Sequence, residues 1–316
     1  MKNQLIVAGS PHLVTKNDTQ RIMLDVLIAL LPATVAASLI FGLRALLLIA
    51  VTVLSSVLFE YLFRLLLHRK NTVSDLSAAV TGLILALNLP ADLPIWQAVL
   101  GSLVAIVVVK QLFGGIGKNF ANPALTARII LLLSFASSMN SYSIREQGSL
   151  WDLVSSATPL SVSLVGGDEA SYLTLFLGNH SGAIGETCAL ALLIGLAYLL
   201  LRRVITWHIP VSFVGTVALL SLIGGRDVLF QVLSGGLMLG AIFMATDYVT
   251  SPSSPIGKLV FGVGCGAITV LIRFFGETEG VSYAILMMNI LTPYIDRLTR
   301  RNPLGAVKKA RGGASK

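Results

Sequence analysis

Charged residues are scarce in this chain of 316 residues. Asp, Glu, Lys and Arg together make up 12% of it and aromatic residues 7%, whereas a soluble globular protein averages about 25% charged residues. Apolar residues reach 55% and gather in long runs between short charged connections. Several runs exceed the roughly 20 residues that a helix needs to cross a bilayer. The composition excludes a disordered chain and a cytosolic enzyme, and it predicts a polytopic membrane protein embedded in the lipid bilayer.

Cysteine is also nearly absent. Cys188 and Cys265 are the only two, and they lie in separate apolar segments. This spacing excludes a disulfide scaffold and a cysteine-ligated metal cluster within the chain. We expect two small apolar side chains in the core. Residues 1–21 are polar and precede a full-length apolar run, which is not the pattern of a signal peptide.

Ten apolar segments predict the fold class. They are residues 22–42, 45–67, 73–90, 95–113, 123–142, 183–201, 206–224, 228–247, 257–275 and 281–296. We therefore expect an all-α fold of about ten transmembrane helices. Because the number is even, both termini should lie on one side of the membrane.

The distribution of Lys and Arg predicts which side that is. With a cytoplasmic N-terminus, 18 of the 23 basic residues fall on inside connections and four on outside ones, as the positive-inside rule requires. The inside group is Lys2, Lys16, Arg21, Arg64, Arg69, Lys70, Lys110, Lys118, Arg202, Arg203, Lys258, Arg297, Arg300, Arg301, Lys308, Lys309, Arg311 and Lys316. The outside group is Arg44, Arg145, Arg226 and Arg273, and Arg128 falls within the fifth segment. We expect a protein of the cytoplasmic (inner) cell membrane with both termini cytoplasmic. The net charge of +8 is then a topology signal, and no nucleic-acid partner is expected.

One connection, residues 143–180, is far longer than the others and is expected outside. It divides the chain into an N-terminal membrane half, 1–142, and a C-terminal half with a basic cytoplasmic tail, 181–316. Since each half has five spans, the second enters from the opposite side, which predicts two inverted five-helix halves. Such an architecture tends to place its sites at the interface of the repeats, near broken helices.

A weak internal similarity supports the inverted repeat. Pro90 is followed 23 residues later by Phe113, and Pro252 is followed 23 residues later by Phe275. Each aromatic residue precedes a glycine and follows an apolar span. The general preference of helix ends for proline and glycine explains the same pattern, so the repeat stays a hypothesis.

The long loop carries the sharpest motif, Asp152-Leu153-Val154-Ser155-Ser156-Ala157-Thr158-Pro159-Leu160. By themselves Ser, Thr and Pro favour a turn, and Thr158 before a proline is held extended. The stretch also resembles the signal Asp-x-x-(Ser/Thr)-Gly-Ala-Thr, at which a flavin transferase attaches FMN to the threonine hydroxyl through its phosphate. Ser156 stands where that signal has glycine, which would slow modification if the modified conformation needs a positive φ there.

Four further regions and a short N-terminal motif extend the resemblance along nearly the whole chain. In order they are Ser10-Pro11-His12, residues 81–90 (TGLILALNLP), 110–124 (KQLFGGIGKNFANPA), 243–252 (FMATDYVTSP) and 287–289 (MMN). Together they resemble the NqrB/RnfD family of membrane subunits. NqrB-like chains have an extended N-terminal region, whereas about 20 residues precede the first span here, so the RnfD branch is favoured.

The resemblance implies a membrane electron-transfer subunit of the Rnf complex, an ion-translocating (Na⁺ or H⁺) ferredoxin:NAD⁺ oxidoreductase. It implies FMN bound covalently to Thr158, with Asp152, Ser155, Ser156 and Ala157 completing the motif. The implied partners are a flavin transferase, a second flavinylated subunit, membrane iron–sulfur subunits and a cytoplasmic NADH/ferredoxin module. Partners are required, because the chain has neither an iron–sulfur cysteine motif nor a nucleotide-binding domain.

The Gly-rich connection 114–123 allows two interpretations. One is a flexible loop before a helix that begins at Pro123. The other is a polar pocket in a broken membrane region, where irregular backbone is tolerated only beside protein or water. The resemblance associates this stretch with a non-covalent riboflavin, which implies Asn119 and Asn122 as amide contacts to the ring.

Acidic residues in membrane spans are energetically expensive and therefore informative. Glu186, near the outer end of the sixth segment, and Asp247, beside Thr246 and Thr250, are candidates for an ion path or for flavin contacts. Carboxylate and hydroxyl oxygens suit a hard cation such as Na⁺.

Three other acids have local explanations. Asp25 lies one turn into the first helix, where the N-terminal dipole stabilises it. Glu60 precedes Arg64 by four residues, which is the spacing of a helical ion pair. Asp75 is placed to cap the third span.

Two other functions remain open at this point. One is an NqrB-type subunit of a Na⁺-pumping NADH:quinone reductase, and the other is a flavin-free solute transporter or channel with an inverted repeat. Glycines four apart, in 236–240 and 262–266, predict close helix packing. The four histidines lack the spacing of a metal or haem site.

Overall fold

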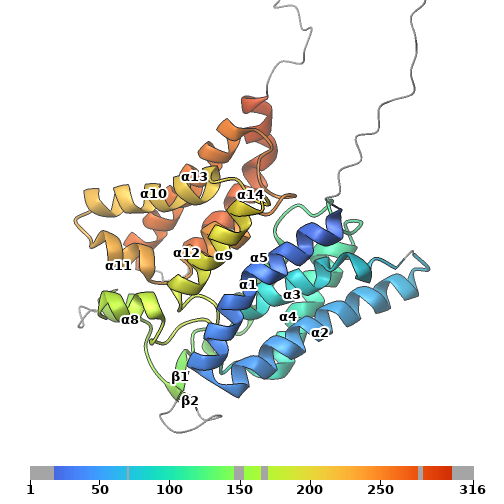
Figure 1. The fold of residues 1–316 in the computed structure, drawn as a ribbon, viewed down its shortest axis with the longest axis horizontal. Coiled ribbons are helices and arrows are strands. Elements are labelled where there is room, and N and C mark those ends of the chain that lie inside the picture. Colours follow the sequence, from blue (N-terminus) through green and yellow to red (C-terminus); the bar gives the residue numbers. More distant parts are fainter. Residues whose placement is uncertain (1–17, 70, 146–152, 165–169, 277–279, 301–316) are drawn as a thin grey trace, which may run out of the picture.

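The computed structural model describes residues 18–69, 71–145, 153–164, 170–276 and 280–300. This part of the chain is mostly helical (Figure 1). Its first half contains α1 (Thr19–Phe41), α2 (Leu43–Leu66), η1 (Val73–Asp75), α3 (Ser77–Leu87), α4 (Ile95–Leu103), η2 (Val104–Gln111), α5 (Pro123–Ser134) and α6 (Ala136–Met139). The connecting region contains β1 (Ser143–Arg145), β2 (Leu153–Ser155), α7 (Pro159–Leu164) and α8 (Tyr172–Leu177). The second half contains α9 (Ala189–Leu201), α10 (His208–Ile223), α11 (Val228–Leu233), α12 (Leu237–Leu239), η3 (Gly240–Met244), α13 (Pro255–Phe274) and α14 (Gly280–Thr299).

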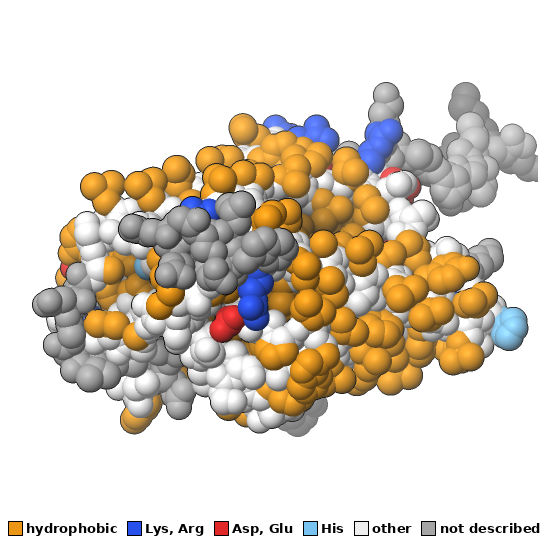
Figure 2. Space-filling view, turned by 90° about the horizontal axis from the view of Figure 1, so that it is seen from below, with side chains coloured by type: hydrophobic (Ala, Val, Ile, Leu, Met, Phe, Trp, Pro, Cys, Tyr) orange, Lys and Arg blue, Asp and Glu red, His pale blue; other side chains and the backbone are white. Residues whose placement is uncertain are grey.

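In the described part of the chain, three helices, α1, α2 and α13, are long and apolar enough to cross a membrane, with mean hydropathies of 2.2, 2.2 and 1.8. Shorter apolar helices accompany them, among them α3, α5, α9 and α10. The outer faces of these helices expose large apolar side chains, for example Leu39, Leu54 and Leu222, at 67–69%. Figure 2 shows such side chains spread over one face of the molecule, with few charges among them. A continuous apolar surface of this kind marks contact with a membrane or a partner rather than with water.

The expectation of ten full-length spans is confirmed only in part. The sixth segment becomes helical only at Ala189, and the eighth is divided among α11, α12 and η3. Two π-helical pieces, η2 and η3, interrupt the regular pattern, one in each half. π-Helical turns are rare and are frequently found at functional sites.

Close packing joins the two halves. α1 packs against α9 and α5 packs against α14, so N-terminal and C-terminal elements lie side by side (Figure 1). Gly195 permits the first contact, because a Cβ there would lie 2.4 Å from the carbonyl oxygen of Ala29. The irregular segment before α9 also pairs with the turn after α3, where the amide of Gly185 donates to the carbonyl of Leu87 over 2.7 Å. This pairing satisfies backbone groups that a membrane interior would otherwise leave unsatisfied.

Glycine packing within the second half follows the expectation from sequence. A Cβ on Gly262 would lie 1.9 Å from the Ser212 hydroxyl oxygen, and one on Gly266 would lie 2.6 Å from Cβ of Thr216. Both neighbours belong to α10, so these glycines let α13 approach that helix closely. The predicted role of these two glycines is confirmed.

The connections gather at two ends of the molecule. At the Asp247 end lie the start of α1, the turn after η2 and the turn after η3. At the Thr158 end lie β1, β2, α8 and the α1–α2 turn (Figure 1). Close to this turn, Arg44 of α2 forms an ion pair of 3.0 Å with Asp92, which lies between α3 and α4. The long loop contains two short strands and two short helices in its described residues.

Candidate functional site

A cavity of about 250 Å³ opens between the halves at the Asp247 end. We call it the Asp247 cavity. Its wall is mostly apolar, with side chains of α1, α3, α9 and η3 such as Met23, Ile84, Leu199 and Phe243. The polar side chains in the wall are Thr19, Ser77, Thr81, Lys110, Asn119, Asn122, Thr246, Asp247 and Tyr248. Asn119, Asn122 and Asp247, which the sequence indicated separately, therefore lie in one cavity.

Asn122 has a structural task at this cavity. Its side-chain oxygen accepts from the amides of Ala124 and Leu125 at 3.1 and 3.3 Å and so caps α5. Its amide nitrogen donates to the carbonyl of Met244 in the other half over 3.2 Å. Pro123 occupies the first turn of the helix, as the sequence predicted. Asn122 is buried, and its bonds hold the two halves together at the cavity wall.

Asn119 is more available to a ligand. Its amide nitrogen donates to the carbonyl of Ala121 over 3.0 Å, and it lies in the glycine-rich turn that enters the cavity. Gly114, Gly115 and Gly117 hold φ values of 115°, 95° and 86°, which side chains with a Cβ rarely adopt. The glycines therefore serve the tight turn that carries Asn119 into the cavity wall.

Asp247 enters the cavity from the turn after η3. One of its carboxyl oxygens accepts from the hydroxyl of Thr250 over 3.0 Å. Thr246 bonds instead to the carbonyl of Ile242, 2.5 Å away in the preceding turn. Thr250 is thus bonded to Asp247, while the hydroxyl of Thr246 is directed to its own backbone; the role of Asp247 in an ion path or in flavin contacts stays a prediction.

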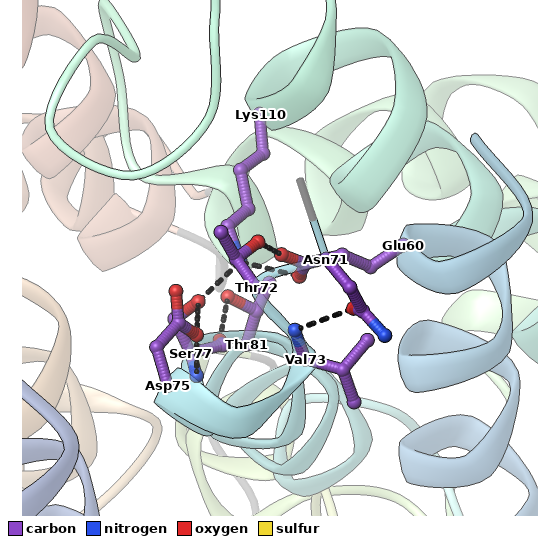
Figure 3. Close-up of polar contacts among 8 residues, drawn as sticks. All are labelled: Glu60, Asn71, Thr72, Val73, Asp75, Ser77, Thr81 and Lys110. Carbon is purple, nitrogen blue, oxygen red and sulfur yellow. Dashed lines mark hydrogen bonds and ion pairs between the residues drawn. The ribbon is translucent and has the colours of Figure 1, made fainter. Parts of the chain in front are cut away.

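A buried ion pair (Figure 3) includes Lys110 of the wall of this cavity. The ammonium of Lys110, at the end of η2, lies 2.8 Å from Oε2 of Glu60 on α2 and donates to Oγ of Ser77 over 2.6 Å. Thr72 donates to the second oxygen of Glu60 over 2.7 Å. Lys110 is 3% exposed and Glu60 0%. The predicted pairing of Glu60 with Arg64 is wrong, because the carboxylate turns inward to Lys110 rather than along its own helix.

Sequence reasoning missed Lys110 as a site residue, since it counted the side chain as one of the inside charges. A lysine placed within an apolar segment was the available signal, because such a charge is costly unless it has a partner. The capping role predicted for Asp75 is confirmed. Its carboxylate accepts from the backbone amide and the hydroxyl of Ser77, at 2.8 and 2.5 Å, where α3 begins.

Asp25 has a different role from the one expected. Its carboxylate accepts from the hydroxyl of Tyr198 at 2.9 Å and from the guanidinium of Arg202 at 3.2 and 3.3 Å. Both donors come from α9 or its end. The helix-dipole explanation is therefore wrong, because long-range partners in the other half neutralise the charge. Asp25 ties α1 to α9 close to the Asp247 cavity.

Thr158 lies at the opposite end, directly before α7. Its hydroxyl donates to Oγ of Ser161 over 3.0 Å and accepts from the Ser161 amide over 3.3 Å. The side chain is partly buried and lines a groove of about 520 Å³, together with Leu133, Tyr142 and Tyr283. Thr158 thus lies in a groove wall that combines apolar and aromatic side chains with the polar side chains of Asn140 and Ser161.

The motif residues before Thr158 are also exposed at this end. Ser155, Ser156 and Ala157 lie on the surface, and the first motif residue, Asp152, lies outside the described residues. Ser156 is not among the residues with positive φ, and its amide donates to the carbonyl of Tyr142 over 2.9 Å. In this conformation the serine carries no backbone strain that a glycine would relieve.

Glu186 lines a small cavity of about 20 Å³ with Thr158, Arg128 and His180. It lies in the turn before α9, not in a span, and accepts from the amide of Ala183 over 3.0 Å. Arg128, buried in α5, donates to Asn88 over 2.9 Å. Burial lowers the pKa of His180, so its imidazole is neutral at pH 7. Glu186 and Asp247 therefore lie at different ends and do not form one ion site.

The Asp247 cavity and the Thr158 groove fit two different kinds of bound group. The Asp247 cavity suits a flat, mainly apolar ring with polar edges, because amide, hydroxyl and charged groups interrupt an apolar wall. The Thr158 groove suits a group attached to the threonine hydroxyl. Among the described residues no cluster of three or more His, Cys, Asp or Glu could hold a metal ion.

Comparison with known proteins finds relatives along nearly the whole chain. A family model described as "NQR2, RnfD, RnfE family" matches residues 6–305. A subunit of the Na⁺-translocating ferredoxin:NAD⁺ oxidoreductase complex of Acetobacterium woodii is 47% identical, covering 96% of both chains. A subunit of the proton-translocating ferredoxin:NAD⁺ oxidoreductase complex of Clostridium ljungdahlii is 38% identical over 95% of this chain and 96% of the relative. A subunit of the ion-translocating oxidoreductase complex of Escherichia coli O7:K1 is 35% identical over 95% of this chain and 98% of the relative.

Proposed function

Because this chain belongs to the NQR2, RnfD, RnfE family, we propose that it passes electrons across the membrane, through flavins, within an ion-translocating ferredoxin:NAD⁺ oxidoreductase complex. The observation that carries this proposal is the placement of two candidate sites at opposite ends of one apolar molecule. The Asp247 cavity lies at one end and Thr158 at the other. A carrier at each end is what transfer across a bilayer needs.

Thr158 would hold FMN through a phosphodiester to its hydroxyl, and the flavin would supply reversible electron transfer. Attachment at the phosphate leaves the ring free, so the link acts as a tether. A tethered carrier meets its redox partners at a fixed position instead of by diffusion. The apolar and aromatic side chains of the groove, such as Leu133 and Tyr142, would hold the ring next to the protein.

The Asp247 cavity would hold the riboflavin. Asn119 offers an amide to the ring edge, and the apolar side chains of α1 and α9 cover its faces. Asn122 keeps the wall in place through its cap and its bond to Met244. An inverted repeat would account for the location, because the cavity lies where elements of both halves meet.

Other subunits must complete the reaction. The relatives are named as subunits of multi-subunit complexes, so further Rnf subunits are expected beside this chain. We propose that these include a second flavinylated subunit, membrane iron–sulfur subunits and a cytoplasmic NADH/ferredoxin module. A flavin transferase would load Thr158. With the positive-inside orientation, the Asp247 end is cytoplasmic and the Thr158 loop lies outside.

The translocated ion would pass Asp247, because its carboxyl group lies beside a hydroxyl group. One relative is named for Na⁺ translocation and another for proton translocation. A carboxylate with a hydroxyl neighbour serves either ion, as a hard oxygen ligand or as a proton carrier. Glu186, at the other end, would serve the path where the ion leaves or enters. Driving one charge against 100 mV requires about 2.3 kcal/mol.

Asn119→Ala is expected to weaken riboflavin retention by about three- to tenfold, the equivalent of one lost hydrogen bond. Acid-extractable flavin in the purified full-length chain is the measurement. Asn71→Ala, at an exposed asparagine outside the cavity wall, is the matched control and should retain the riboflavin. A doubly substituted Asn119→Ala/Asn122→Ala chain that retains its riboflavin would refute the amide contacts.

Asp247→Asn is expected to raise the Na⁺ concentration for half-maximal activity about tenfold, since an amide binds cations more weakly than a carboxylate. If the ion is H⁺, the pH dependence shifts instead. The measurement is ferredoxin-driven NAD⁺ reduction by the whole complex in membrane vesicles. Asp296→Asn, on the exposed surface of the same end, is the control. An Asp247→Asn complex with unchanged ion and pH dependence would contradict the assignment.

A further inference from the structure

Lys110 belongs to the wall of the Asp247 cavity. The side chain lines the cavity together with Ser77, whereas its counterion Glu60 is absent from the cavity wall. The ammonium Nζ lies 2.8 Å from Oε2 of Glu60 (Figure 3). Of the two partners in this buried ion pair, the positively charged one is therefore the one that belongs to the cavity wall.

The ammonium retains hydrogen-bonding capacity. It carries three N–H donors, and the bonds found among the described residues go to Glu60 and Ser77. The hydroxyl of Ser77 in turn donates to Asp75, so two carboxylates stabilise the charge of Lys110. A lysine held in its charged form inside an apolar wall is a fixed positive charge rather than a flexible surface group.

We propose that Lys110 sets the reduction potential of the flavin held in the Asp247 cavity. This inference rests on the proposed function, because it requires a flavin there. Reduction places negative charge on the flavin ring, and a nearby fixed cation stabilises the reduced form over the oxidised one. The low dielectric of the apolar wall strengthens this preference. Asp247, in the same wall, is left unchanged by the substitutions at Lys110 and Glu60, so it does not account for a difference between those chains.

The position of Lys110 in the chain supports a tuning role. It lies in η2, the π-helical piece of the first half, while η3 leads to Asp247 in the second half. A π turn contains one more residue than an α turn. If the helix from Ile95 onward were regular, Lys110 would therefore point in another direction. Lys110 and Asp247 thus both lie in, or shortly after, an irregular piece of backbone.

The test uses the full-length chain with Thr158→Ala, so that the only flavin is the non-covalent one. Lys110→Met/Glu60→Gln replaces the ion pair with neutral groups of similar size and leaves no unpaired buried charge. A spectroelectrochemical titration measures the midpoint potential of the bound flavin. We expect the preference for the reduced form to fall at least tenfold, which is about 30 mV for a two-electron couple.

Two controls separate charge from packing. Lys110→Arg keeps the cation and is expected to keep the potential near that of the Thr158→Ala parent. Arg44→Met/Asp92→Asn removes an ion pair at the opposite end, 44% and 39% exposed in its side chains, and should leave the potential unchanged.

The outcomes distinguish the inference from the function on which it rests. A flavin-loaded Lys110→Met/Glu60→Gln chain with the parent's potential overturns the inference, as does a Lys110→Arg chain that shifts as far as the neutral variant. A parent chain without extractable flavin overturns the proposed riboflavin site itself, and the role of Lys110 with it. If the neutral variant does not fold, Lys110→Gln/Glu60→Gln, which also leaves no buried charge and keeps a donor for Ser77, is measured in its place with the same criteria.

Discussion

Thr158→Ala is expected to abolish covalent flavin on this chain completely. The substitution removes the hydroxyl that would form the phosphodiester and leaves the neighbouring hydroxyls of Ser155, Ser156 and Ser161 in place. It costs the fold little, because the lost bonds to Ser161 resemble a helix cap worth about 1 kcal/mol. The measurement is in-gel flavin fluorescence of the denatured full-length chain after co-expression with a flavin transferase.

The controls for Thr158 follow from the geometry of its turn. Thr158→Ser keeps a hydroxyl and should retain part of the fluorescence, while Thr174→Ala in α8 should retain all of it. Ser156→Gly should leave modification unchanged, since Ser156 does not hold a positive φ. A dark wild-type band, with the transferase active on another substrate, would contradict covalent flavinylation. The flavin-free solute transporter would then be the favoured function.

Lys110→Met is expected to destabilise the chain by about 3–5 kcal/mol. Removal of one partner from a buried ion pair leaves the other charge uncompensated, and Glu60 is fully buried. Lys110→Met/Glu60→Gln should recover most of this loss, because neither remaining group carries a charge. Denaturant unfolding of the detergent-solubilised chain gives the free energies for a double-mutant cycle.

An exposed ion pair provides the comparison for this second result. Arg44→Met breaks the contact with Asp92 at the molecular surface, where such pairs contribute about 0–1 kcal/mol. If Lys110→Met proves as mild as Arg44→Met, the Lys110–Glu60 pair is not the buried, stabilised unit that the structure describes.

Much of this protein follows from the sequence alone. Long apolar runs with few charges predict a helical membrane protein, because every backbone group in a bilayer must be satisfied within the segment. Local motifs are equally informative. The cap by Asp75, the helix start at Pro123 and the close-packing Gly262 and Gly266 were predicted from their immediate neighbours, and the structure confirms them. Membership of the family also follows from stretches of sequence, and the comparisons confirm it.

Only the tertiary structure decided which charges meet. Glu60 pairs with Lys110, 50 residues away, and Asp25 with Arg202, 177 residues away, whereas sequence reasoning assigned both acids to local partners. Spacing along a helix reveals neighbours within one turn, but not the neighbours that packing brings from another helix. The Asp247 cavity also arises from tertiary packing, because its wall combines residues of both halves. Apolar patterning determines that the helices enter the membrane. The packing of the helix faces determines where the charges and the cavity lie. This packing depends on glycine contacts and on irregular backbone.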